Sequence, residues 1–308
     1  MTHAYRFSLA LVLALGVAAT TAGYAQNKSQ QRTITVDGTA RTYLVYHPSN
    51  VAANAPLVVA LHGGFGTGER MEAGVHWDPK AESGGFVAAF PDGVKNGWNW
   101  GGCCGNGQAP GERDTIDDVK FLSAMVAQIE QADRVDPHRV FFTGISAGAN
   151  MSWRMACQAK IPIAAIATVA GTIDTECDSP QKLSVLSING TADTQIPIAG
   201  GRSTGPYVRD ILPSIPSDLD KFRTLDGCGP AVVNKAGVVT TTINPCPDGR
   251  AIKWIVIDGA GHQWPGADPP SAAALARIRA AGSNVAMPST AINATDTIWQ
   301  FFSDKMSR

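Results

Sequence analysis

The sequence predicts an α/β protein with a mostly parallel sheet, an antiparallel hairpin at its start and helices on both faces. Two alternating runs, Thr33–Val36 and Arg41–Tyr46, flank an Asp-Gly pair, which is a strong hairpin signal. Later runs are apolar throughout, as expected of strands that are buried on both faces. Helical patterns separate these runs, and such alternation of strands and helices is typical of a parallel sheet.

The expected elements can be placed by residue number. Six apolar runs predict the buried strands: Leu57–Leu61, Phe86–Phe90, Val140–Thr143, Ile163–Ala170, Leu183–Ile188 and Ile252–Ile257. Three segments predict helices: Ile116–Gln131, Ala147–Ala159 and Ala291–Lys305. No internal repeat and no linker marks a boundary, so residues 26–308 are expected to form a single domain.

Composition excludes several classes of protein. The 308 residues carry 25 Lys and Arg against 26 Asp and Glu, a net charge of −1, which leaves no basic footprint for nucleic acid. Hydrophobic residues make up 44%, which excludes a disordered chain and a protein with many membrane spans. The 32 glycines and 19 prolines indicate long irregular loops between the regular elements.

Residues 1–25 are typical of a secretory signal peptide. Arg6 supplies the positive start, the apolar stretch Phe7–Thr20 follows, and Gly23 and Ala25 are the small residues of a cleavage site before Gln26. A retained membrane anchor is the alternative, which the shortness of the apolar stretch disfavours. The mature protein is therefore expected to be secreted, extracellular or periplasmic, and free of the membrane.

Six cysteines remain after the predicted cleavage, and an even number in an oxidising compartment favours disulfides. Cys228 and Cys246 bracket a hairpin-like stretch and are expected to pair. A second expected pair joins Cys157, at a helix end, to Cys177, in the loop after the next strand. The adjacent Cys103 and Cys104 are expected to bond either to each other or to other cysteines. The sequence contains no cluster of Cys and His residues at metal-ligand spacing, so no metal site is predicted.

The segment Gly144-Ile-Ser146-Ala147-Gly148 has the G-x-S-x-G pattern between a predicted strand and a predicted helix. Two glycines permit a turn tight enough to expose the serine hydroxyl in a strained position. The helix that follows adds positive potential at its N-terminus. Ser146 is therefore the candidate nucleophile for attack on a carbonyl.

A serine nucleophile needs a base, and where this motif occurs the chain order is serine, acid, histidine. Of the six histidines, His262 alone follows Ser146, in a loop directly after a predicted strand. Asp193, also just after a predicted strand, is the expected acid. Asp258 is the alternative, but it lies only four residues from His262 and would have difficulty reaching the far side of the ring.

Two backbone N–H groups should stabilise the oxyanion. The expected donors are Ala147, next to the nucleophile, and Gly64 in the segment His62-Gly-Gly-Phe65, with Phe65 as the second choice. His62 itself is expected to pack this turn rather than to catalyse.

Aromatic residues in the loops are candidate substrate contacts. Trp98 and Trp100 lie in a glycine-rich segment, and Trp264 follows His262 by two residues. Exposed rings beside a catalytic base often form walls for a ring or a sugar. The alternative is that each ring fills space in a loop-rich surface. Asp117 and Asp118, by contrast, are expected to serve as N-terminal charges of a helix.

The motifs LHGG, GWNWGGCCG, DDVKFL, GISAGANMSWRMAC, NGTADTQIP and GHQWPG occur here in an order that resembles one known family. It comprises the polyhydroxybutyrate depolymerase-like and feruloyl esterase proteins of the carbohydrate esterase family 1 type. The resemblance spans about Arg41 to Gly266. It implies an α/β-hydrolase catalytic domain, a triad of Ser146, Asp193 and His262, no cofactor, and an extracellular ester substrate.

The leading interpretation is thus a secreted serine esterase that hydrolyses feruloyl or acetyl esters of plant polysaccharide through an acyl-enzyme. A depolymerase of poly(3-hydroxybutyrate)-type polyester or its oligomers is the alternative. A non-catalytic binding protein on a hydrolase fold is a remote third reading, because all three triad residues are present. The sequence makes no prediction of the oligomeric state.

Overall fold

The computed structural model describes residues 29–49, 51–101, 115–204, 211–273, 275–276 and 286–306. The predicted signal peptide, residues 1–25, and the pair Cys103 and Cys104 lie outside the described residues. In the described part of the chain, no helix is both long enough and apolar enough to cross a membrane.

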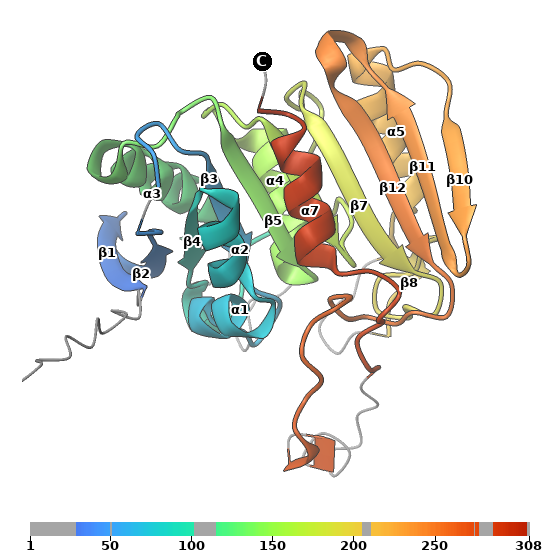
Figure 1. Ribbon diagram of the computed structural model, residues 1–308, viewed down its shortest axis with the longest axis horizontal. Coiled ribbons are helices and arrows are strands. Elements are labelled where there is room, and N and C mark those ends of the chain that lie inside the picture. The colour runs from blue at the N-terminus through green and yellow to red at the C-terminus, as the bar shows by residue number, and fades with distance from the viewer. Residues whose placement is uncertain are drawn as a thin grey trace, which may run out of the picture.

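A ten-stranded sheet forms the centre of the described structure, in the order β1-β2-β4-β3-β5-β6-β7-β12-β11-β10 (Figure 1). Its strands are β1 Gln30–Val36, β2 Thr39–Tyr46, β3 Leu57–Leu61, β4 Val87–Pro91, β5 Val140–Ile145, β6 Ala165–Val169, β7 Ser184–Gly190, β10 Val232–Ala236, β11 Val239–Pro245 and β12 Ala251–Ile257. A separate two-stranded sheet pairs β8, Gly201–Arg202, with β9, Ile211–Leu212. The six strands from β4 to β12 in this order run parallel.

Helices cover both faces of the sheet. They are α1 Gly68–Gly74, α2 Trp77–Gly84, α3 Asp118–Asp133, α4 Ala147–Gln158, α5 Ile215–Asp226 and α7 Ala294–Ser303. The apolar residues of α3, α4 and α5 pack with one face of the strands, and those of α1, α2 and α7 pack with the other. This arrangement is the predicted α/β class, and its parallel centre with a β1–β2 hairpin at one edge is that of the α/β-hydrolase fold.

The predicted strands and helices are confirmed to within two or three residues of their ends. The turn between β1 and β2 has positive φ at both central residues, Asp37 (49°) and Gly38 (77°), as the predicted hairpin requires. Missing from the prediction are the short strands β8 and β9 and the helices α1, α2 and α5. Helices α1 and α2 have only seven and eight residues. The sequence of α5 does carry a helix signal, because the capping residue Ser214 precedes apolar residues that are spaced four and then three positions apart.

Both expected disulfides are confirmed. Cys157–Cys177 joins the last turn of α4 to the loop after β6, and Cys228–Cys246 closes the β10–β11 segment against the end of α5. The described residues contain one group with metal-ligand spacing, Asp226 with Cys228 and Cys246. Because these two cysteines are bonded to each other, they offer no thiolate to a metal.

A buried carboxyl group connects α5 to the loop after β6. Asp218 is completely buried, and its Oδ2 accepts hydrogen bonds from the Thr172 hydroxyl (2.6 Å) and the Ile173 N–H (3.0 Å). Its Oδ1 is buried and has no hydrogen-bond partner within the described part of the chain. Burial raises the pKa of Asp218 to about 6, against the opposing effect of these hydrogen bonds.

This shift predicts a pH-dependent stability that Asp218→Asn removes. Because the native state holds the Asp218 proton more tightly than the unfolded state, the free energy of unfolding should fall as pH rises from about 4 to above 6. The contribution is on the order of 2–3 kcal/mol. Urea unfolding at pH 4.5 and 7 should show a smaller decline for Asp218→Asn than for the wild type. Parallel pH profiles for the two proteins would contradict the assignment.

Candidate active site

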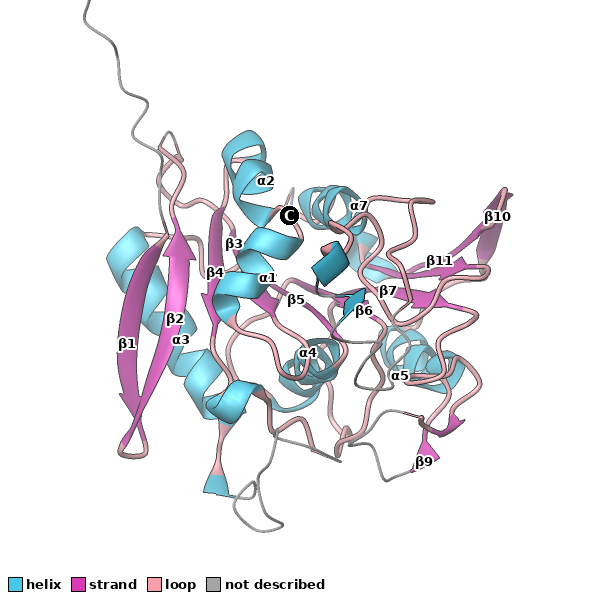
Figure 2. Cartoon of the chain, turned by 90° about the horizontal axis from the view of Figure 1, so that it is seen from below, coloured by secondary structure: helices cyan, strands magenta, loops and turns pink. Residues whose placement is uncertain are grey.

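The carboxyl ends of the parallel strands meet at one edge of the sheet, and the candidate residues follow three of these strands. Ser146 follows β5, Asp193 follows β7 and His262 follows β12. Figure 2 looks onto this side of the molecule from below the view of Figure 1. Functional groups commonly collect at this edge of an open α/β sheet, because the loops there converge.

Ser146 lies in a strained turn between β5 and α4. Its φ of 55° and ψ of −122° are unusual for a residue with a side chain. The backbone is held by two bonds: Ser146 N–H donates to the Val169 carbonyl (3.0 Å), and the Ser146 carbonyl accepts from Asn150 N–H (2.9 Å). Among the described residues, no hydrogen bond engages the Ser146 hydroxyl.

The two glycines of the motif are required by close packing. A Cβ on Gly148 would lie 2.2 Å from the Leu61 carbonyl oxygen and 2.5 Å from that of His62. At Gly144, a Cβ would lie 2.5 Å from the backbone of Gly148. No side chain fits at either position, so α4 can start directly against the end of β3. This explains in contacts what the sequence pattern predicts.

His262 and Asp193 meet as the sequence predicts. His262 Nδ1 lies 2.8 Å from Asp193 Oδ2, and both side chains are largely buried. The other carboxylate oxygen, Oδ1, accepts the backbone N–H groups of Gln195 and Ile196, each at 2.9 Å. This network assigns the Nδ1 proton to the bond with Asp193 and leaves Nε2 as the basic nitrogen.

The loops that carry these two residues are joined by their backbones, since Ala192 N–H donates to the Ala260 carbonyl (2.9 Å). The rival acid, Asp258, is exposed and accepts a hydrogen bond from the Thr191 hydroxyl instead (2.9 Å). Geometry therefore favours Asp193 as the partner of His262.

The loop after β3 lies beside Ser146, since a Cβ on Gly63 would be 3.6 Å from the Ser146 Cβ. Phe65 N–H already donates to the Asn96 carbonyl (2.9 Å), so the second choice for the oxyanion donor is occupied. Within the described residues, no bond engages Gly64 N–H. Ala147 N–H belongs to the first turn of α4, where backbone donors lack helical partners.

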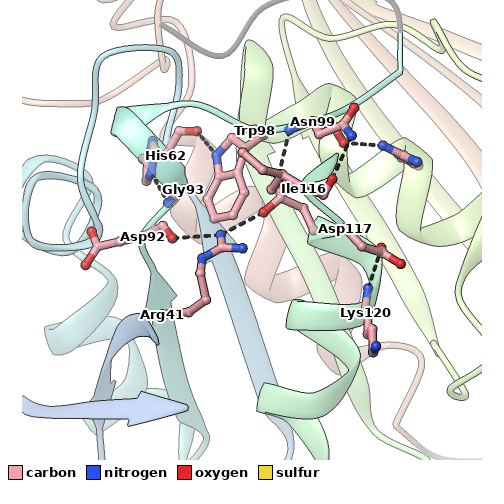
Figure 3. A network of polar contacts seen from close by, with 11 residues as sticks. Arg41, His62, Asp92, Gly93, Trp98, Asn99, Ile116, Asp117 and Lys120 are labelled. Carbon is pink, nitrogen blue, oxygen red and sulfur yellow. Dashed lines mark hydrogen bonds and ion pairs between the residues drawn. The ribbon is translucent and has the colours of Figure 1, made fainter. Parts of the chain in front are cut away.

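His62 holds this loop in shape, as expected from the sequence (Figure 3). Its Nε2 accepts the Gly93 N–H (3.0 Å), so the ring proton is on Nδ1, which donates to the Gly63 carbonyl (2.7 Å). Burial lowers the pKa of His62, which keeps the ring neutral. The Trp98 indole N–H donates to the His62 carbonyl (2.9 Å).

A buried ion pair, absent from the sequence prediction, supports the same region (Figure 3). Arg41 donates to Asp118 Oδ1 (2.7 Å) and to the Asp92 carbonyl (3.1 Å), while Asp118 Oδ2 accepts Asn99 N–H (2.6 Å). Both Asp117 and Asp118 lie at the helix N-terminus as expected: Asp117 caps α3 through Lys120 N–H, and Asp118 is the acidic residue of the first turn. Arg41 lies on the inward face of β2 together with apolar residues. A charged residue at an inward position of the alternating pattern was the sequence signal for a buried ion pair.

The structure corrects the predicted aromatic substrate wall. Trp98, Trp100 and Trp264 are 0%, 3% and 2% exposed, so protein atoms cover their faces. The Trp264 N–H donates to the Thr295 hydroxyl (3.2 Å), and its ring meets that of Trp77 edge-on. Large rings fill the interior most efficiently, and here that role replaces contact with a substrate.

Two cavities differ in their position relative to the candidate site. The larger, about 910 Å³, is lined by Glu69, Glu72, Asp78 and Asp92 among others, but by none of Ser146, Asp193 and His262. A smaller cavity of about 330 Å³ is lined by His262. Cavity volume therefore does not identify the reaction site, since the smaller cavity is the one that adjoins the candidate base.

Comparisons with known proteins identify the family and the fold. Residues 41–199, just over half of the chain, match the family described as Esterase PHB depolymerase. The chain is 27% identical over 232 residues to the bifunctional acetylxylan esterase/xylanase XynS20E of Neocallimastix patriciarum, covering 75% of this chain and 32% of that protein. It is 25% identical to feruloyl esterase C of Emericella nidulans, covering 72% and 76%.

Among solved structures, the acetyl xylan esterase from Aspergillus awamori superposes with a TM-score of 0.59 over 89% of this chain and 99% of that one. Sequence identity in this superposition is 16%, so this likeness bears on the fold alone.

The burial of Trp264 predicts that Trp264→Ala impairs stability rather than substrate choice. Removal of a buried indole costs about 3–5 kcal/mol, so the melting temperature should fall clearly. The kcat/KM values for methyl ferulate and p-nitrophenyl acetate should fall by similar factors. Trp264→Phe, which keeps a ring without the N–H, should lose less stability. A loss of kcat/KM confined to methyl ferulate would instead support a role of Trp264 in substrate contact.

Proposed function

The chain belongs to the Esterase PHB depolymerase family and is a carboxylic ester hydrolase; we propose that it acts through Ser146, His262 and Asp193 on acyl esters of plant polysaccharide. The observation that carries the mechanism is the 2.8 Å contact between His262 Nδ1 and Asp193 Oδ2. It orients a basic nitrogen at the sheet edge where Ser146 lies in its strained turn.

In the first half of the proposed reaction, Ser146 Oγ attacks the ester carbonyl carbon while His262 Nε2 accepts the hydroxyl proton. The carbonyl oxygen becomes an oxyanion, which the N–H groups of Ala147 and Gly64 stabilise. Asp193 stabilises the imidazolium through Nδ1. His262 then returns the proton to the alcohol oxygen, the C–O bond breaks, and the acyl group remains on Ser146.

Water completes the cycle. His262 Nε2 takes a proton from the attacking water, which adds to the acyl carbon through the same oxyanion geometry. The Ser146 oxygen leaves and regains the proton from His262, and the carboxylic acid departs. The net change is hydrolysis of one ester to an acid and an alcohol, and the proposed mechanism uses side chains and backbone N–H groups alone.

The substrate proposal follows the relatives, which are named for feruloyl and acetylxylan esters. A polyester or oligomer depolymerase is the second candidate, favoured by the description of the matching family. Since the three indoles are buried, stacking of an aromatic acid on them no longer favours ferulate over other acyl groups. A panel of methyl ferulate, acetylated xylan and hydroxybutyrate oligomers separates these candidates.

Substitutions in the proposed triad should have graded effects on turnover. Ser146→Ala and His262→Ala should each remove nearly all activity, because the two residues act as one unit. Asp193→Asn should lower kcat by up to about 10⁴-fold, since it favours the wrong tautomer of the base. Rates on p-nitrophenyl acetate measure all three.

Asp258→Asn is the matched control for the acid, and it should retain close to the wild-type rate. The assignment of Asp193 is wrong if Asp193→Asn keeps more than a tenth of that rate while Asp258→Asn does not.

Export is a second part of the proposal. We expect cleavage after Ala25 and bonding of all six cysteines in the secreted protein. Intact mass after alkylation should correspond to a chain that starts at Gln26 and carries no alkylated thiol. A mass that retains residues 1–25 contradicts cleavage, and two or more alkylated cysteines contradict full bonding.

A further inference from the structure

The cavity beside His262 has a chemical character of its own. It measures about 330 Å³, near the lower end of the range for small-molecule sites. Its polar side chains come from two loops: Thr194 and Gln195 follow β7, and His262 and Gln263 follow β12. The described residues that line it include no Asp, Glu, Lys or Arg and no Phe, Tyr or Trp.

The reaction places this cavity on one side of the ester. The acyl carbonyl must lie at Ser146 and its oxyanion donors, Ala147 and Gly64. The alcohol oxygen must lie at His262 Nε2, because that nitrogen returns the proton to it. His262 lines the cavity and Ser146, Ala147 and Gly64 do not, which is the lining expected of a pocket for the alcohol part of the substrate rather than for its acyl part.

The two glutamines are held by their backbones while their amides remain available. Gln195 N–H donates to Asp193 Oδ1 (2.9 Å), and its carbonyl accepts from the Ser203 hydroxyl (2.6 Å). Gln263 N–H donates to the Gly261 carbonyl (3.0 Å). Among the described residues, neither side-chain amide has a hydrogen-bond partner. Each offers two N–H donors and one carbonyl acceptor, which suit hydroxyl groups that both donate and accept.

We propose that Gln195 and Gln263 form a subsite for a hydroxyl-rich alcohol, such as the sugar unit to which the acyl group is esterified. This inference rests on the proposed esterase function and adds the residues that select the leaving group. A plain alkyl alcohol has no additional hydroxyl groups. It therefore leaves the side-chain amides of the two glutamines without the hydrogen bonds that a sugar would supply. The enzyme should therefore favour sugar esters over methyl esters of the same acid.

The test compares two esters that share one acyl group, 5-O-feruloyl-arabinose and methyl ferulate. The measured quantity is the ratio of kcat/KM for the sugar ester to kcat/KM for the methyl ester. The wild type should favour the sugar ester. Gln195→Leu and Gln263→Leu should each lower the ratio about threefold to tenfold, as expected for loss of a neutral hydrogen bond. The double variant should lower it further.

Gln30→Leu is the matched control. Gln30 is exposed on β1, at the opposite side of the sheet from β12, so this variant should keep the wild-type ratio. An unchanged ratio in Gln195→Leu and Gln263→Leu overturns the subsite, as does a wild type that hydrolyses both esters equally well. Failure of the wild type on these esters and on every other ester of the panel contradicts the proposed function instead.

Discussion

The approach of α4 to the end of β3 is the constraint on which the site depends. With a Cβ of Gly148 only 2.2 Å from the Leu61 carbonyl oxygen, a side chain there would push the helix away from the strand. The close fit lets Ser146 sit in its strained turn beside the loop that carries Gly64. The nucleophile and the proposed oxyanion donors are thus parts of one rigid contact.

Two polar networks hold the remaining groups. The carboxylate of Asp193 is oriented by two backbone N–H groups before it contacts His262, which positions the base. On the other side, the neutral ring of His62 and the Arg41–Asp118 pair join the loops after β3 and β4 to the start of α3. Loss of one partner of a buried pair leaves an uncompensated charge, so these contacts make the loop geometry hard to change.

Sequence alone predicts the parallel centre of the sheet, the hairpin and the Asp193–His262 contact, because these features follow from continuous apolar runs, turn residues and chain order. Its failure on the tryptophans has a physical cause. A ring in a Gly-rich loop beside a base is equally suited to fill the interior, and sequence does not record which surface the ring faces. The Arg41–Asp118 pair was missed because no motif or chain order links the inward-facing charge on β2 to Asp118, which lies 77 positions away.

Covalent labelling tests the central claim, that Ser146 is an activated nucleophile, most directly. A fluorophosphonate transfers its phosphonyl group to such a serine with loss of fluoride, and peptide mass spectrometry locates the adduct. One modified residue, Ser146, is expected in the wild type, and labelling should be strongly reduced in His262→Ala. An adduct on another serine, or ester hydrolysis that persists while Ser146 stays unlabelled, would contradict it.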